Sequence, residues 1–504
     1  MTQTAEGAPR TVVILGGGTA GWMTAAALTA VFAHEQVRIR LVESDDIGIV
    51  GVGEATLPAI REFNAFAGIA EAEMLAATEG TFKLGIEFVD WGRIGARYVH
   101  PFGAHGRPIG GVEFHHHWTR ARLAGAAVGT IDDYAPAIEA CRQNRFEPPQ
   151  RDGRIESAYS YAYHFDANLY AGFLRRVAEG RGLRRTEGRV VAVEREGDAV
   201  LALQMASGER IEGDLFIDCS GFRALAIGGQ PADAWEDWSD WLPCDRAVAV
   251  PSARTPDFPP YTRSTATRAG WRWRIPLQHR TGNGHVYSSG HISDDEAVAE
   301  LLKGLDGEAL AEPRILRFRS GRRRASWLGN CVAVGLSSGF LEPLESTSIY
   351  LIQAAVTQLV RFWPGAAAGR PVLRDAFNAA IDLEYDRVRD FLILHYWLNT
   401  RDEPFWRERC EKAPPDSLRE TVALFQRRGH VPSYRNGLFA APSWISVMTG
   451  QGMSPQAYDR LADLVPLETA VSALSAERAR VVSHVAAMPS HEAYVARRAM
   501  ERAA

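Results

Sequence analysis

The sequence has no long hydrophobic run and no excess of charge of either sign. Among its 504 residues no apolar run approaches the roughly 20 that a membrane-spanning helix needs, so no membrane protein is expected. The first apolar run, Val12 to Leu15, leads straight into glycines, which is not typical of a signal peptide. With 56 basic and 61 acidic residues the net charge is −5, too balanced for a generic nucleic-acid binder.

Cysteine is also scarce. The five cysteines are an odd number, lie far apart and form no Cys-x-x-Cys pair, which excludes a disulfide scaffold and a thiolate zinc site: Cys141, Cys219, Cys244, Cys331 and Cys410. A reducing, cytoplasmic location is therefore expected. At 46% hydrophobic and 23% charged residues, the composition is that of a globular protein with a large core.

The chain opens with a strand–glycine–helix–strand pattern. Thr11–Leu15 predicts a buried strand, Trp22–Phe32 a buried helix, and Val37–Val42 a second strand that ends in Glu43. The glycine-rich segment between the first strand and the helix has the spacing of a dinucleotide-binding turn: Gly16-Gly17-Gly18-Thr19-Ala20-Gly21.

Each glycine of this turn has a physical role in such a site. Gly16 permits the tight turn, Gly18 lets the backbone approach a pyrophosphate, and Gly21 allows close packing of helix on strand. The helix that starts near Ala20 would point free amides at the phosphates. Glu43 lies where a carboxylate accepts the ribose hydroxyls. The alternative, a glycine turn without a ligand, is the weaker hypothesis.

Two features favour FAD over NAD. No second complete Gly-x-Gly-x-x-Gly is present, and Asp214–Gly221 resembles the later strand–glycine segment of FAD monooxygenase-type folds. A β-meander separates it from the opening, with expected strands at 190–194, 199–205 and 210–212.

The predicted fold class is therefore α/β. We expect a FAD-binding Rossmann-like domain of the aromatic-monooxygenase type, with the β-meander as an insertion and a mostly helical C-terminal region. Residues 1–370 would form the core with interleaved substrate-facing segments, and 371–504 would cover the substrate site. We expect long loops over 233–270, a helix over 373–397, and one surface or dimer-packing helix around 482–503.

Three separated segments resemble the flavin-dependent tryptophan halogenase family. They are Gly16–Trp22, the Trp-x-Trp-x-Ile-Pro signature at Trp271–Pro276, and Gly339–Thr347, which is similar to that family's Pro-Leu-Glu-Ser-Thr strap. Gly51–Thr56 and Phe82–Gly85 are supporting matches. The resemblance covers the chain to about Gln353 and is weaker beyond it.

The resemblance implies a FAD-dependent halogenase. In that family reduced FAD, supplied by a separate flavin reductase, reacts with oxygen, and a halide attacks the flavin hydroperoxide to give hypohalous acid. The acid travels to a lysine beside an aromatic substrate. Lys83 matches that lysine, and Glu345 matches the glutamate that stabilises the arenium ion and accepts its proton. Ser346 would orient the site.

The same resemblance assigns the ligand-binding positions. Thr347 and Ser348 match the halide-binding backbone positions, although Ser348 stands where the family usually has glycine. The FAD-binding positions are Gly16, Gly17, Gly18, Ala20, Gly21, Glu43, Val52, Ala55 and Leu336. Trp271 and Trp273 would share one strand face, where core packing is favoured over substrate contact.

Two further patterns are interpreted as structural. His115-His116-His117, placed on a strand, would point alternately and could not share one ion, so no metal is expected. The arginines between Arg314 and Arg324 predict a solvated, partly paired strand rather than a nucleic-acid patch.

The substrate is less closely defined. The segment from His430 to Trp444 does not match a tyrosine-rich lid that holds an amino-acid backbone, so indole is preferred over free tryptophan, with a slight preference for bromide over chloride. The rival hypotheses are a flavin-dependent aromatic hydroxylase and a non-catalytic flavin-binding protein. A homodimer is possible.

Overall fold

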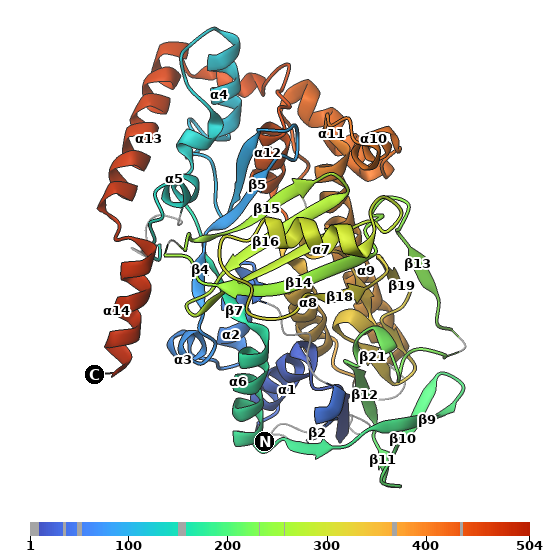
Figure 1. The fold of residues 1–504 in the computed structure, drawn as a ribbon. Helices are drawn as coiled ribbons and strands as arrows, with labels where there is room; N and C mark the ends of the chain where they lie inside the picture. Colours follow the sequence, from blue (N-terminus) through green and yellow to red (C-terminus); the bar gives the residue numbers. More distant parts are fainter. Residues whose placement is uncertain are drawn as a thin grey trace, which may run out of the picture. The chain divides into compact units, whose positions relative to one another are not determined.

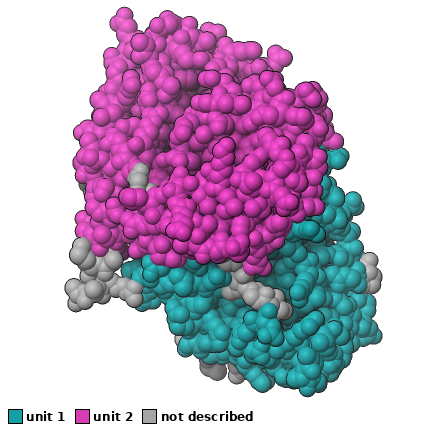
Figure 2. All heavy atoms as spheres, in the orientation of Figure 1, with its two compact units in different colours: residues 1–80, 165–245, 317–386 teal, residues 81–164, 246–316, 387–504 magenta. Residues whose placement is uncertain are grey.

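The computed structural model describes residues 10–33, 37–47, 53–149, 158–230, 232–256, 258–364, 370–433 and 437–503. The chain divides into two compact units, each assembled from three separate segments (Figure 2). Unit 1 comprises residues 1–80, 165–245 and 317–386, and unit 2 comprises 81–164, 246–316 and 387–504. The domain boundary at residue 370 stays a prediction.

Unit 1 is built on a six-stranded sheet with the order β20-β21-β12-β1-β2-β8, of which Figure 1 labels β2, β12 and β21. All neighbours pair in parallel except β20 and β21. The strands are β1 (Thr11–Leu15), β2 (Arg38–Glu43), β8 (Arg184–Glu187), β12 (Leu215–Asp218), β20 (Trp327–Leu328) and β21 (Cys331–Ala333). The expected strand–helix–strand opening is confirmed, with α1 (Thr19–Val31) between β1 and β2.

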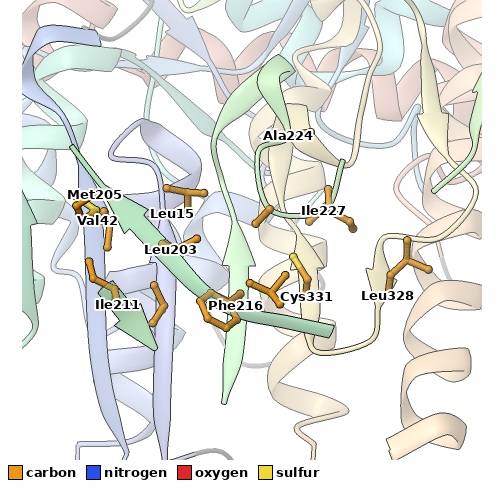
Figure 3. Packing of buried hydrophobic residues seen from close by; sticks show 14 residues of the cluster. Leu15, Val42, Leu203, Met205, Ile211, Phe216, Ala224, Ile227, Leu328 and Cys331 are labelled. Carbon is orange, nitrogen blue, oxygen red and sulfur yellow. The ribbon is translucent and has the colours of Figure 1, made fainter. Parts of the chain in front are cut away.

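The β-meander insertion is confirmed as an antiparallel sheet of β9 (Val190–Glu196), β10 (Ala199–Met205) and β11 (Arg210–Glu212). Its inner face buries Leu203 and Ile211 in one cluster with Leu15, Val42 and Phe216 of the parallel sheet (Figure 3). This apolar contact attaches the meander, because each fully buried side chain of this size contributes about 1.5–3 kcal/mol.

Further short strands and helices complete unit 1. The sheet β13-β19-β22 brings the second and third segments together. The elements are β3 (Gly53–Ala55), β13 (Trp235–Asp237), β19 (Gly321–Arg323), β22 (Gly339–Phe340), α2 (Ala59–Phe66), α3 (Glu71–Ala77), α6 (Ala167–Gly180) and α8 (Thr347–Arg361), with the short helices η1 (Asp45–Ile47), η3 (Gly221–Arg223), η4 (Gly335–Ser337) and η5 (Pro343–Glu345).

Unit 2 contains a seven-stranded sheet with the order β18-β14-β17-β16-β15-β5-β6. Its strands are β5 (Gly85–Val89), β6 (Arg97–Pro101), β14 (Arg246–Ala253), β15 (Tyr261–Thr267), β16 (Gly270–Pro276), β17 (Arg280–Tyr287) and β18 (Arg314–Arg317). The expectation of long loops over 233–270 is therefore wrong. β15 pairs in parallel with β5, a partner far away in the sequence that a local pattern does not reveal.

A second pairing in unit 2 joins β4 (Thr81–Lys83) to β7 (Ala162–Asp166). The helices near the sheets are α4 (Phe114–Leu123), α5 (Pro136–Arg142) and α7 (Asp294–Lys303), with the short helix η2 (Ile131–Tyr134). None of the described helices is long and apolar enough to cross a membrane.

The mostly helical C-terminal region is confirmed. It contains α9 (Arg370–Trp397), α10 (Pro404–Glu411), α11 (Asp416–Arg428), α12 (Ala441–Gly450), η7 (Arg460–Leu464), α13 (Leu467–Ala487) and α14 (His491–Ala503). The single helix expected around 482–503 is in fact two helices. Met488 is extended, with φ −68° and ψ 148°, because the residue before a proline avoids the helical region.

We expect Gly21→Ala to lower the free energy of unfolding by about 1–3 kcal/mol, the range for overpacking a tight contact. A Cβ at Gly21 would lie 1.8 Å from the carbonyl oxygen of Gly16. Gly172→Ala in α6 is the control, since no atom lies within 4 Å of its added Cβ, and it should stabilise by roughly 0.5–1 kcal/mol. Urea unfolding of both variants tests this, and equal stability would contradict the close packing.

Candidate functional site

The glycine turn after β1 is held by close backbone contacts. Gly16 has φ +114°, its amide donates to the Val42 carbonyl at 2.8 Å, and a Cβ there would lie 2.3 Å from the Cys219 oxygen. A Cβ at Gly17 would overlap the Glu43 carboxylate, at 1.3 Å from Oε2. Gly16, Gly17 and Gly21 therefore each occupy a position that a side chain would disrupt.

Gly18 differs from its neighbours. Its φ is −77°, which any residue adopts, and no described atom lies within 4 Å of an added Cβ. Gly18 is also the N-cap of α1, and no side chain caps that helix. At this position the described atoms leave the start of α1 uncovered, and the amides and positive dipole end of a helix N-terminus favour an anion such as a pyrophosphate. The residues present fit a bound dinucleotide.

The other predicted FAD-binding positions are placed as follows. Glu43 ends β2 and accepts a hydrogen bond from Arg185 Nε at 2.6 Å. Ala55 is buried in β3, and Val52 lies outside the described residues. Leu336 lies in η4, where a Cβ at Gly335 would be 2.9 Å from the Cβ of Ala20, so this turn packs against the start of α1.

Sequence reasoning missed the role of Asp218. Its buried carboxylate accepts hydrogen bonds from the amides of Ala226 and Ile227, at 2.7 and 2.9 Å, and from the amide and hydroxyl of Ser220, at 2.9 and 2.6 Å. It therefore fixes the loop at the end of β12. The acid at the end of a predicted strand was the available signal.

The strap that leads into α8 carries Glu345 and Ser346. Glu345 is fully buried, and Ser346 has φ 59° and ψ 36°, a left-handed conformation that costs a non-glycine residue about 1–3 kcal/mol. Tyr385 of α9 donates to the Gly339 carbonyl at 3.2 Å, and Arg323 Nε donates to that of Ser337 at 2.7 Å. These contacts hold the beginning of the strap and the turn before it.

The N-terminus of α8 has features of an anion site. Its first residues are Thr347 and Ser348, and Ser346 makes no side-chain capping bond to the helix. Among the described residues, the buried Oγ1 of Thr347 has no hydrogen-bond partner. A buried hydroxyl without a partner is costly, which points to a ligand beside it.

Lys83 is fully buried in β4 of unit 2. Its Nζ lies 5.1 Å from the ring centre of Phe102, close enough for a cation–π interaction. The chain has three lysines, and the other two, Lys303 and Lys412, are exposed. In the sequence Lys83 was marked by the motif Phe82–Gly85, whereas nothing marked the role of Phe102. Glu345 belongs to unit 1.

The tryptophan motif packs as expected. Trp271 and Trp273 are buried on one face of β16, with ring centres 6.1 Å apart, while Arg272 and Arg274 lie on the other face. A Cβ at Gly284 would lie 2.1 Å from Trp273, so this ring covers the neighbouring strand β17.

The three consecutive histidines are helical, so the strand assumed for them is wrong. They lie in α4, where the buried side chains of Phe114, Trp118 and Ala121 follow the helical repeat. Nε2 of His115 contacts the Gly429 carbonyl at 2.8 Å, and Nε2 of His117 contacts that of Ile109 at 2.9 Å. Burial, followed by the charge of His116, lowers the pKa of His115 to about 3.

The arginine run is paired, as expected, but parts of it are buried rather than solvated. Arg322 is 8% exposed and forms ion pairs with Glu236, Asp382 and Asp386. Arg323 pairs with Asp233.

Comparisons with known proteins agree on one family. The tryptophan halogenase family model matches residues 11–467. Tryptophan 6-halogenase SttH of Streptomyces toxytricini is 36% identical, with 97% of this chain and 98% of that protein covered. Two solved structures are each 44% identical to this chain. They are Xcc4156, a flavin-dependent halogenase from Xanthomonas campestris, and BrvH, a flavin-dependent halogenase from Brevundimonas sp. BAL3. Their TM-scores are 0.93 and 0.92, covering 97% of this chain and 98% and 99% of theirs.

Gly18→Ala should weaken FAD binding by about tenfold to a hundredfold without loss of stability, because the methyl group fills the space through which a phosphate reaches the α1 amides. Fluorescence titration with oxidised FAD measures the affinity, and urea unfolding measures stability. Gly172→Ala is again the control. Unchanged FAD affinity in Gly18→Ala would place the pyrophosphate elsewhere.

Proposed function

The chain belongs to the tryptophan halogenase family, and from that premise we propose that it uses reduced FAD, O2 and chloride or bromide to halogenate an electron-rich, indole-type aromatic. The observation that carries the proposal is a fully buried lysine, Lys83, in a chain whose other lysines are exposed. Lysine is one of the residue types that are most often exposed, so its burial marks a candidate functional group.

When bound, reduced FAD with O2 supplies the oxidising equivalents that convert halide to hypohalous acid. The residues that hold the cofactor are those of the glycine turn, with the amides at the start of α1 on the pyrophosphate. Ala55 and Leu336 belong to the same proposed set, and Glu43 accepts the ribose hydroxyls while Arg185 orients its carboxylate.

The halide binds at the N-terminus of α8. The amides of Thr347 and Ser348 donate to the anion, which the helix dipole also favours. The Oγ1 of Thr347 supplies a further donor in the same place. Bromide is slightly preferred over chloride because it is easier to oxidise, and Ser348 stands where the family usually has glycine.

Lys83 donates a hydrogen bond from Nζ to hypohalous acid and polarises the halogen. The aromatic carbon attacks the halogen, so the carbon–halogen bond forms as the oxygen–halogen bond breaks. Glu345 stabilises the resulting arenium cation and accepts its ring proton, and the released hydroxide is protonated to water. Ser346, held in its left-handed conformation, orients Glu345.

The preference for indole over free tryptophan rests on the segment that precedes and begins α12. Residues 437–444 carry no charged side chain that could hold an amino-acid backbone. Phe439 and Trp444 instead pack on Phe391, with ring centres 3.8 and 5.0 Å apart. Residues 434–436 lie outside the described part of the chain.

The proposal includes a separate flavin reductase as the source of reduced FAD, a cytoplasmic location and a possible homodimer. A halide and substrate panel run with a flavin reductase tests the activity. Mass spectrometry separates a halogen isotope pattern from the single added oxygen of a hydroxylase.

Lys83→Ala should abolish halogenation while FAD binding and reoxidation of reduced FAD continue, because the lysine acts on the halogenating species and not on the cofactor. Product mass and oxygen consumption measure the two processes. Lys303→Ala, which removes an exposed lysine of α7, is the matched control and should leave both unchanged. Full halogenation by Lys83→Ala would show that free hypohalous acid halogenates the substrate without Lys83. Loss of FAD binding in this variant would show that Lys83 has a structural role.

Glu345→Gln should lower the turnover number by about 10²-fold without abolishing it, since the amide keeps a dipole but loses the charge that faces the arenium ion. Glu384→Gln is the control: it alters another buried glutamate but keeps an acceptor for the Tyr350 hydroxyl, which donates at 2.8 Å. Turnover is measured under saturating substrate. A loss of the same size in both variants would argue for a general effect of charge in unit 1.

A further inference from the structure

The lysine-bearing strand β4 is only three residues long and lies at the edge of its sheet. It pairs with β7 through Thr81, Phe82 and Lys83. So short a strand has few ladder hydrogen bonds, and the orientation of the Lys83 backbone therefore depends on contacts from outside the sheet.

One of these contacts comes from the start of the last helix. The amide of Phe82 donates to Nε2 of His491 at 3.1 Å, and Nδ1 of His491 lies 2.9 Å from the Phe258 carbonyl oxygen. An amide can only donate and a carbonyl can only accept, so the proton must be on Nδ1 and the ring must be neutral. His491 is 1% exposed, and helix α14 contacts β4 (Figure 1).

The residue before Phe82 is fixed in the same way. The Thr81 hydroxyl donates its single proton to the Pro276 carbonyl at 2.7 Å, so its oxygen accepts from Nδ1 of His164 at 3.0 Å. Nε2 of His164 contacts the Thr262 hydroxyl, also at 3.0 Å. Two buried histidines thus hold the two positions that precede Lys83.

The Phe82 ring is enclosed as well. It stacks on Phe146 with ring centres 4.2 Å apart and meets Tyr494 of α14 edge-on at 5.3 Å. Helix α14 therefore contacts both the backbone and the side chain of the residue next to Lys83.

We propose that His491 is a positioning residue for Lys83, so that helix α14 belongs to the machinery of halogen transfer. The inference rests on the proposed role of Lys83. His491 fixes the peptide unit from which the lysine side chain extends, and a displacement of about 1 Å at a reacting group can cost about 10²-fold in rate.

The decisive variants are His491→Phe, which keeps a ring but loses both hydrogen bonds, and His491→Gln, whose amide oxygen can accept from Phe82 and whose amide nitrogen can donate to Phe258. His285→Phe is the matched control. His285 is also buried in unit 2 with both ring nitrogens in hydrogen-bond contact, to Thr267 at 2.9 Å and Ala297 at 3.2 Å, but it lies in β17.

Two measurements report on position. Hydrogen exchange of the Phe82 amide, followed by NMR in the cofactor-free protein, should quicken about tenfold in His491→Phe and not in His285→Phe. The amount of halogenated product formed per reduced FAD consumed should fall by about tenfold to 10²-fold in His491→Phe. In steady-state kinetics kcat for halogenation should fall, while KM for the aromatic substrate stays within about twofold. His491→Gln should recover most of the exchange protection of the Phe82 amide and most of the product yield.

The outcomes are separable. Normal product yield in folded His491→Phe, with Lys83→Ala inactive, would overturn this inference alone, whereas an active Lys83→Ala would overturn the proposed role of Lys83 on which it rests. A loss of yield in His285→Phe equal to that in His491→Phe would also overturn the inference. If His491→Phe does not fold, His491→Asn replaces it, since asparagine is too short to reach both partners. A product yield that is low in His491→Asn and restored in His491→Gln supports the positioning role of His491. Equal product yields from these two variants refute it.

Discussion

The glycine turn depends on one constraint, the close approach of three backbone segments. They meet at Gly16, Gly21 and Cys219. A Cβ at Gly16 would lie 2.3 Å from the Cys219 oxygen, and one at Gly21 would lie 1.8 Å from the Gly16 oxygen. Only with this packing does α1 begin at the carboxyl ends of β1 and β12, where open α/β sheets bind their ligands. The Asp218 carboxylate then fixes the loop beyond β12.

Where a pattern is local, the sequence predicts the fold closely. The bounds of β1, β10 and β11 agree with those expected, because buried alternation and turn residues mark both ends of each strand. β14 and β15 were missed, since prolines and polar residues made the segment resemble a loop. Their strand character comes from pairing with β17 and β5, which are distant in the sequence, and such tertiary context overrides a weak local preference.

The same distinction applies to the candidate site. Lys83 and Glu345 could be predicted because each lies within a recognisable motif. Phe102 and His491 carry no local signature, since each acts on a strand residue that is distant in the chain. Asp218, which acts on its own loop, is marked only as an acid at the end of a predicted strand. A motif therefore identifies a candidate reacting group, whereas the side chains packed around it become visible only when the chain is folded.

The buried histidines of unit 2 hold the strand of Lys83 without adding a positive charge there. Burial, and then the charge of Lys83, lower the pKa of His164 well below its ordinary value, and burial lowers that of His491 to about 4. Both rings thus remain neutral near pH 7, donating through Nδ1 and accepting through Nε2, so they satisfy buried hydroxyls and amides on either side of the strand. An arginine or a lysine in either place would bring a like charge close to Lys83 and would have no lone pair for the Phe82 amide. Histidine meets both requirements, because its neutral ring carries one donor and one acceptor.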